Sequence, residues 1–255
     1  MAEADVVTLL RGKGQQILDG PRHPYPFTQV PEADELLNDL HHHPHAFVLA
    51  CVMDRQIKAE RAWLIPYRIS QKLGTFEISE LQKLTRAQVR RLMTKPEPLH
   101  RFVNTMSDNF HDAVARICET YAGNAANIWR DAPPSANVVY RFLEFRGVGR
   151  KIATMAANLL VRHLKIPLRD YYSVDVSVDV QVRRVLRRLG LIAPDDSDDR
   201  IIYRVRGLVP EFPGIIDSPA WEIGRTWCRP VARDCAGCYM HVVCPTAATR
   251  IQPDI

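Results

Sequence analysis

The chain lacks any run of about 18 consecutive apolar residues, so the sequence predicts no membrane-spanning helix. Its first residues include Glu3 and Asp5 where a signal peptide would carry basic side chains, and no long apolar stretch follows them. Low-complexity tracts and internal repeats are also missing. These absences lead us to expect an ordinary globular protein of the cytoplasm, long enough at 255 residues for one large domain or two small ones.

Cysteine is scarce, and four of the six cysteines are gathered near the C-terminus as Cys-x6-Cys-x2-Cys-x5-Cys. These are Cys228, Cys235, Cys238 and Cys244. The gaps are short enough for the intervening loops to wrap a compact inorganic centre, and four thiolates suit either a zinc ion or an iron–sulfur cluster. Structural zinc sites usually have two Cys-x2-Cys pairs, whereas this segment has one pair between longer gaps. The spacing therefore favours a cluster over zinc.

Helical periodicity covers nearly the whole chain. Apolar stripes of helical spacing occupy residues 6–18, 46–53, 59–69, 81–92 and 110–121. Residues 174–182 instead alternate valine with polar side chains, a pattern typical of a half-buried strand. The stripe from Val182 to Leu189 fits a helix that stops at Gly190, and Asp179 suits its N-cap. We predict extended chain over 171–178 and a helix that begins just after Asp179.

The segment Gly147-Val148-Gly149 joins two predicted helices by a tight turn. Its glycines permit positive φ and leave backbone N–H groups uncovered at a helix N-terminus, where the helix dipole favours anions. Such a turn can hold a DNA phosphate without reading sequence. Arg150 and Lys151 follow at once. Partial burial at the positive helix end would favour the neutral, nucleophilic amine of Lys151, and the alternative is a surface lysine that contacts phosphate.

Basic residues exceed acidic ones, with a net charge of +5, which permits attraction to a polyanion without proving it. Arginines 183, 184, 187 and 188 lie too close in sequence to point in one direction, so we expect about half of them to reach a nucleic acid. The histidines 41, 42, 43 and 45 are interpreted as a solvated loop or helix start rather than a ligand or phosphate contact, with no acidic partner beside them.

Three motifs in this order resemble the endonuclease III-like branch of the helix-hairpin-helix (HhH-GPD) DNA glycosylases. They are Gly147-Val-Gly-Arg-Lys151, the Val-Asp-x-x-Val-x-Arg-Val element around Asp179, and the cysteine quartet. The resemblance runs from about residue 46 to Cys244. It implies an all-α monomer of two helical domains with a DNA cleft between them. Residues 44–165 would form a six-helix barrel with the helix-hairpin-helix, and residues 1–43 and 166–255 an iron–sulfur domain.

The resemblance also implies roles for individual residues. Lys151 matches the family's catalytic lysine and Asp179 its catalytic aspartate. Asp175 is a less favoured candidate, because only Asp179 precedes the Val-x-Arg-Val pattern. Gln56 resembles the glutamine that fills the gap left by a flipped base. The cysteine quartet would bind a [4Fe–4S] cluster. The expected DNA contacts are Gln56, Gly147, Val148, Gly149, Arg150, Arg183, Arg184 and Arg229.

Three departures from the family pattern concern the substrate more than the chemistry. Arg146 stands where proline usually precedes the turn, and Gln181 where histidine commonly follows the aspartate. The interval between Lys151 and Asp179 is about ten residues longer than is typical of the family.

The implied activity is base-excision repair. The protein would flip a damaged base out of double-stranded DNA, excise it, and act as an abasic-site lyase through a lysine Schiff base. Its partner would be double-stranded DNA with a damaged base or abasic site, and we expect no binding to membranes. In a prokaryote the protein would associate with the nucleoid. One alternative is a monofunctional glycosylase in which Asp179 activates water. Another is a non-catalytic DNA-binding or redox-sensing iron–sulfur protein. The sequence does not identify the damaged base.

Overall fold

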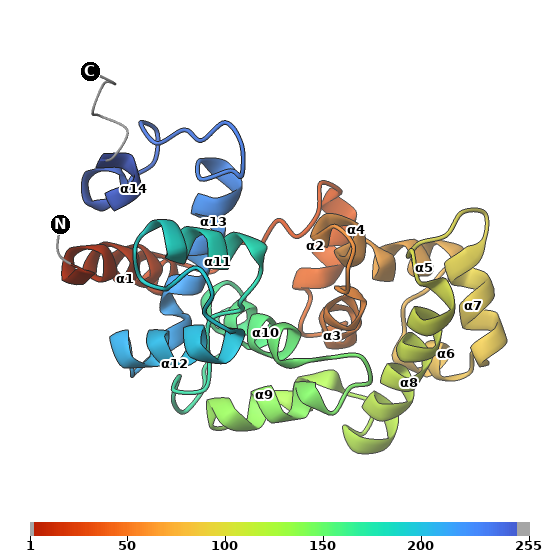
Figure 1. The fold of residues 1–255 in the computed structure, drawn as a ribbon. Coiled ribbons are helices and arrows are strands. Elements are labelled where there is room, and N and C mark those ends of the chain that lie inside the picture. Colours follow the sequence, from red (N-terminus) through yellow and green to blue (C-terminus); the bar gives the residue numbers. More distant parts are fainter. Residues whose placement is uncertain (1–2, 249–255) are drawn as a thin grey trace. The chain divides into compact units, whose positions relative to one another are not determined.

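The computed structural model describes residues 3–248, and over these residues it contains helices and no strand (Figure 1). The prediction of an all-α protein is therefore confirmed. The chain divides into two compact units. We call Met1–Pro21 with Arg169–Ile255 the cysteine unit, and Arg22–Leu168 the hairpin unit. Within residues 3–248, no helix combines the length and apolar character needed to cross a membrane.

The hairpin unit is built around a helix with no polar face. Every residue of α3 (Pro44–Met53) is buried, as the apolar run in the sequence predicts. Its neighbours include α8 and α10, and Phe47 packs against aromatic rings from other parts of the unit. The other elements are α2 (Pro31–Asn38), α4 (Ala59–Trp63), α5 (Ile65–Leu73), α6 (Ile78–Gln82), α7 (Arg86–Thr94), α8 (Val103–Thr120), η1 (Ala125–Ile128), α9 (Ser135–Leu143) and α10 (Arg150–Arg162).

Residues 22–43 belong to the hairpin unit, so the boundary lies at Pro21 rather than near residue 43. The reason is aromatic packing, because Phe27 stacks on Trp63 with ring centroids 4.7 Å apart. The helix α2 then contacts α3 and α5. These contacts tie the segment to the core around α3.

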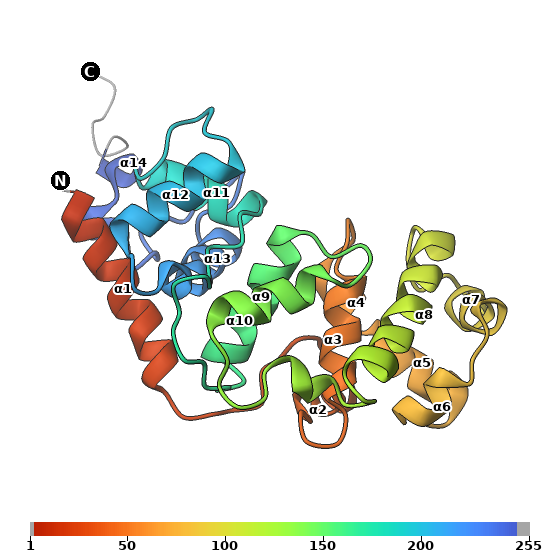
Figure 2. The same cartoon turned by 90° about the horizontal axis from the view of Figure 1, so that it is seen from below.

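One expected helical stripe is two helices. Residues 81–92 share an apolar periodicity, yet α6 ends at Gln82 and α7 begins at Arg86 and runs beside α8 (Figure 2). Thr85 starts the second helix with a capping box, in which its side chain accepts from the N–H of Gln88 and the Gln88 side chain accepts from the N–H of Thr85. The Thr-x-x-Gln signature was readable in the sequence and marks the break.

In the cysteine unit, α11 (Val180–Arg188) packs against α13 (Asp217–Thr226). The N-terminal helix α1 (Glu3–Asp19) packs on η2 (Pro213–Ile216) and α13, closely enough that a Cβ on Gly14 would lie 2.0 Å from the Ile215 carbonyl oxygen. Residues 171–178 are non-helical and lead into α11, but Tyr172 and Ser173 form a turn, closed by the N–H of Val174 on the Tyr171 carbonyl, where extended chain is predicted. The remaining elements are α12 (Asp198–Leu208), η3 (His241–Val243) and α14 (Pro245–Ala248).

Candidate active site and cysteine cavity

The turn between α9 and α10 packs against the protein at Gly147 and Val148 and has open space beside Gly149. Gly147 has φ +88°, and a Cβ there would lie 2.3 Å from the Nδ2 of Asn109, which is buried. Val148 is buried and anchors the turn. Gly149 is the N-cap of α10, and a Cβ there would meet nothing within 4 Å. Since a glycine cap offers no side-chain acceptor, the N-terminus of α10 suits an anionic ligand from outside.

Lys151 lies in the first turn of α10, with its side chain 45% exposed. Its Nζ is 3.9 Å from Oδ2 of Asp54, whose side chain is only 8% exposed. Asp54 is the residue that follows α3. Sequence reasoning did not single it out, because nothing local connects it to a lysine in a distant helix.

The loop after α3 reaches the turn. A Cβ on Gly147 would lie 3.4 Å from a guanidinium nitrogen of Arg55. The next residue, Gln56, is exposed and has a left-handed backbone with φ +55°. Three successive residues of this loop therefore come near the turn or follow on from it. Asp54 lies beside Lys151, Arg55 lies beside Gly147, and Gln56 is the next residue along the chain.

The two candidate aspartates have different surroundings. Asp179 is the N-cap of α11, and its Oδ1 accepts from the N–H groups of Gln181 and Val182 at 2.8 Å each. This confirms the predicted cap. Asp175 is 4% exposed, and its two carboxylate oxygens accept from Nε and a terminal nitrogen of Arg206 at 2.8 Å each. The buried Asp175 is thus bound on both oxygens by the partly exposed Arg206, whereas the carboxylate of Asp179 is oriented at a helix start.

Three of the four arginines of α11, Arg183, Arg184 and Arg188, are hydrogen-bonded to other groups of the protein. Arg183 donates to the Asp196 carbonyl and pairs with Asp198. Arg184 donates to the carbonyl oxygens of Cys228 and Gly224, at 2.8 Å each. By contrast, Arg187 is exposed, and so are two expected DNA contacts on other elements, Arg150 and Arg229.

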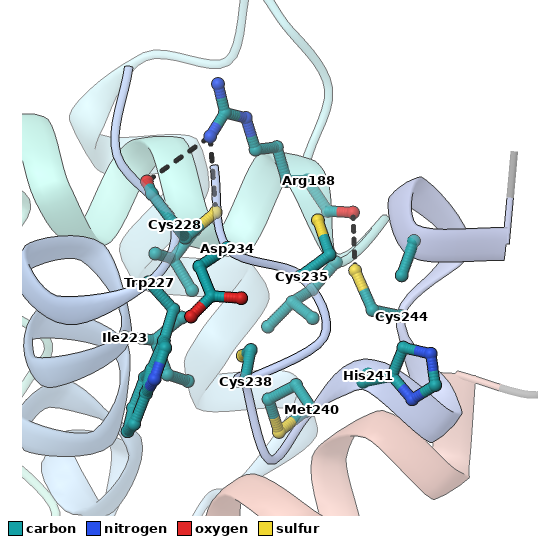
Figure 3. Close-up of a pocket in the computed structure, with 13 residues that line it drawn as sticks. Arg188, Ile223, Trp227, Cys228, Asp234, Cys235, Cys238, Met240, His241 and Cys244 are labelled. Atoms are coloured by element: carbon teal, nitrogen blue, oxygen red, sulfur yellow. Dashed lines mark hydrogen bonds between the residues drawn. The ribbon is translucent and has the colours of Figure 1, made fainter. Parts of the chain in front are cut away.

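All four clustered cysteines line one cavity of about 30 Å³ in the cysteine unit (Figure 3). Its walls include Val185 of α11, Leu189 at the end of that helix, Ile223 of α13, and Met240. A terminal nitrogen of Arg188 donates to the Cys228 Sγ at 3.3 Å. Burial raises the pKa of the thiols of Cys238 and Cys244, and the neighbouring cysteines add to this shift. Ionised sulfur ligands here therefore need a positive centre to stabilise them.

The donor set can be tested against the two candidate centres. Within residues 3–248, no three His, Cys, Asp or Glu side chains lie close enough together to hold a single metal ion. A zinc ion with Zn–S bonds of about 2.3 Å would bring its four sulfurs to within about 3.8 Å of one another. In a cubane cluster each thiolate binds a different iron, so the sulfurs lie farther apart. The four cysteines line one cavity, and the distances between their sulfurs are what would distinguish the two centres.

The histidine segment has an acidic partner, contrary to expectation. Asp39 accepts from the backbone N–H of His42 at 2.9 Å, and its carboxylate lies 3.1 Å from Nδ1 of both His42 and His43. Partial burial opposes the effect of these hydrogen bonds, which together lower the pKa of Asp39 to about 2. His45 is buried in α3 with Nε2 2.6 Å from the Phe76 carbonyl oxygen, and burial lowers its pKa to about 4. These contacts are those of a folded helix start.

Comparison with known proteins gives matches among solved structures alone. No protein-family model matches the chain, and no curated protein matches it in sequence. A trapped endonuclease III–DNA covalent intermediate superposes with a TM-score of 0.64 at 17% identity, over 99% of this chain and 100% of that one. A thermostable thymine-DNA glycosylase gives 0.62 at 12% identity, with 96% and 98% covered. The Clostridium acetobutylicum 8-oxoguanine glycosylase/lyase, in complex with DNA, gives 0.54 at 19% identity, with 76% and 67% covered.

The match to endonuclease III covers 99% of the chain and therefore extends over both units. At these identities the likeness concerns the fold. The chain therefore has the fold of endonuclease III, as the resemblance of its motifs implied.

Proposed function

We propose that the protein is a DNA repair glycosylase that excises a damaged base and cleaves the resulting abasic site through a Schiff base on Lys151. The observation that carries this proposal is the setting of Lys151. It lies in the first turn of α10, directly after an open glycine turn and 3.9 Å from a buried carboxylate. The likeness of the fold to glycosylases solved on DNA supports the same reading.

The hairpin unit would hold the DNA backbone. The uncapped start of α10 offers backbone N–H groups to one phosphate, and the exposed Arg150 adds positive charge. A base inside a duplex is out of reach, so it has to be extruded at a cost of a few kcal/mol. The exposed, left-handed Gln56 is our candidate to fill the vacated stack.

Excision would use both polar residues that the motifs identified. The Asp179 carboxylate, oriented by two backbone donors, would stabilise positive charge on the sugar as the base departs. The neutral amine of Lys151 would form a bond to C1′ while the bond from C1′ to the base breaks, and the base leaves with a proton. The C1′–O4′ bond would then break as O4′ takes up a proton, which opens the sugar ring and leaves the protonated Schiff base. Loss of a C2′ proton together with the 3′ phosphate would nick the strand.

We propose that Cys228, Cys235, Cys238 and Cys244 hold a [4Fe–4S] cluster, which supplies a one-electron redox centre and ties the C-terminal segment together. The role of these residues is structural, because they present the loop with the exposed Arg229 to DNA. The purified protein should be brown with absorbance near ~400 nm, as thiolate-ligated clusters are, and Cys238→Ser should lose that absorbance. A colourless protein with one bound zinc would overturn this assignment.

The activity is tested on duplexes that carry thymine glycol, uracil, 8-oxoguanine, an alkylated purine or an abasic site. We expect excision of at least one base, and borohydride trapping of a covalent complex on the abasic duplex. Lys151→Ala should abolish trapping. Lys83→Ala, which removes an exposed lysine paired with Glu80, should trap like the wild type. Base release without trapping would favour the monofunctional alternative, and DNA binding without either reaction would indicate a non-catalytic protein.

A further inference from the structure

Asp54 is a buried carboxylate on a rigid support. It follows α3, whose residues are all buried, and its backbone N–H donates to the Cys51 carbonyl at 3.1 Å. The helix α3 contacts α10, which carries Lys151. One partner of the 3.9 Å ion pair is the C-cap residue of α3 and the other lies in the first turn of α10, and both helices belong to one unit.

The two charges differ in exposure. The Asp54 side chain is 8% exposed, while that of Lys151 is 45% exposed and can reach a ligand outside the unit. A carboxylate with little water around it interacts more strongly with a nearby cation than an exposed one does. Asp54 is thus suited to keep a positive nitrogen near one place, with the other side of that nitrogen accessible.

We propose that Asp54 is a positioning residue that holds the nitrogen of Lys151 through formation of the Schiff base. This role rests on the lyase activity proposed above. On an abasic aldehyde, the Lys151 ammonium first gives up one proton, the neutral amine attacks the carbonyl carbon, and the net products are a protonated imine and one water molecule. The nitrogen forms its bond to C1′, and the carbonyl oxygen leaves as water with two of the ammonium protons. One positive charge is present on the nitrogen before and after, and Asp54 stabilises it at both stages.

A purely structural role for Asp54 predicts different results. As a support for α3, it would affect the stability of the unit and the rates of all steps together. As a positioning residue, it would affect formation of the covalent complex while DNA binding and the fold stay intact. Asp54→Asn separates the two, because it keeps the size of the side chain and removes the charge. Asp54→Glu restores the charge at a slightly shifted position.

The experiment uses the full-length protein on an abasic duplex. Single-turnover borohydride trapping gives the rate, fluorescence anisotropy on an uncleavable abasic analogue gives the affinity, and thermal unfolding gives the stability. We expect Asp54→Asn to slow trapping about 30-fold, as loss of a partly buried charge partner should. Affinity and unfolding temperature should stay near those of the wild type, and Asp54→Glu should recover part of the rate.

The matched control is Asp108→Asn, which removes a carboxylate 3.2 Å from Arg90 in the same unit. It should trap at the wild-type rate. Wild-type trapping by Asp54→Asn would overturn the positioning role. Equal losses in Asp54→Asn and Asp54→Glu, in proportion to lost thermal stability, would also overturn it. A wild-type protein that fails to trap would refute the lyase proposal itself, and this role with it.

Discussion

The N-termini of α10 and α11 differ in how their first backbone N–H groups are capped. Each helix begins with backbone N–H groups that have no partner inside the helix. At α10 the cap residue is Gly149, which provides no side-chain acceptor. At α11 the cap is Asp179, and one of its oxygens accepts from two of those groups. The first helix start is thus suited to a ligand anion, and the second fixes a carboxylate of the protein in place.

This difference assigns separate tasks to the two units. The hairpin unit combines the open helix start with Lys151 and Asp54, which suits backbone binding and nucleophilic attack. The cysteine unit contributes a carboxylate of fixed orientation and the cavity lined by cysteines. Neither unit alone contains both motif residues, so the proposed reaction needs the intact chain.

The largest expected effect comes from removing the charge at the capped helix. Asp179→Asn keeps a good N-cap, so the fold should remain, but it removes the charge that would stabilise the sugar cation. We expect single-turnover excision to fall about 10²- to 10⁴-fold. The unfolding free energy, measured in urea, should change by less than about 1 kcal/mol.

Asp175→Asn is the matched control for Asp179→Asn. It removes the charge of the buried Asp175 from its pair with Arg206, whose side chain is 39% exposed, and should lower the unfolding free energy by about 1–3 kcal/mol. Excision per folded molecule should persist. Full activity in Asp179→Asn, or loss of chemistry in a folded Asp175→Asn protein, would show that the wrong aspartate has been chosen.

A smaller effect is expected from alanine substitutions at Gly147 and Gly149, the first of which should lower stability and the second DNA binding. Gly147→Ala would force a side chain into the left-handed region and against Asn109, which should cost about 2 kcal/mol of unfolding free energy. Gly149→Ala meets open space at φ −101° and should leave stability within about 0.5 kcal/mol. Its methyl group would instead approach the N–H groups of α10, and we expect about tenfold weaker binding to an abasic duplex.

Thermal unfolding and fluorescence anisotropy on the two glycine variants check this division. Equal binding by Gly149→Ala and the wild type would mean that no phosphate sits at the start of α10. A Gly147→Ala protein as stable as the wild type would mean that Asn109 can move aside.

Local signals in the sequence were sufficient for much of this arrangement. The Asp179 cap, the stop at Gly190 and the glycine turn each depend on a few neighbouring residues, and each was predicted. The capping box at Thr85 was equally local but was overlooked, because the apolar stripe continued across it. The cysteine quartet was recognisable because its members lie within one short segment.

Pairings between distant segments could not be predicted. Nothing near Asp54 in the sequence connects it to Lys151, and nothing near Asp175 connects it to Arg206. The same limit applies to Arg184, because its partners, the carbonyl groups of Cys228 and Gly224, lie 44 and 40 residues away in the sequence. A side chain's role depends on which acceptor the fold brings to it, and composition does not contain that information.

The smallest expected effect tests how the capped helix contributes charge to DNA binding. Arg187 is exposed on α11, whereas the guanidinium of Arg184 is bound to two carbonyl groups of the protein. Neutralising a phosphate contact lowers the salt slope of DNA binding by about 0.9. We therefore expect Arg187→Ala to lower the slope of log K against log salt by about one unit, measured by anisotropy, with little change in stability.

Arg184→Ala should leave that slope unchanged and lower the unfolding free energy by about 1–2 kcal/mol, because the carbonyl group of Gly224 loses its charged donor and that of Cys228 keeps only Arg188. The reverse pattern would mean that the Arg184 side chain leaves its carbonyl partners when DNA binds. In that case the capped helix would carry a phosphate contact of its own, and the division between an open, ligand-binding helix start and a closed, carboxylate-orienting one would no longer hold.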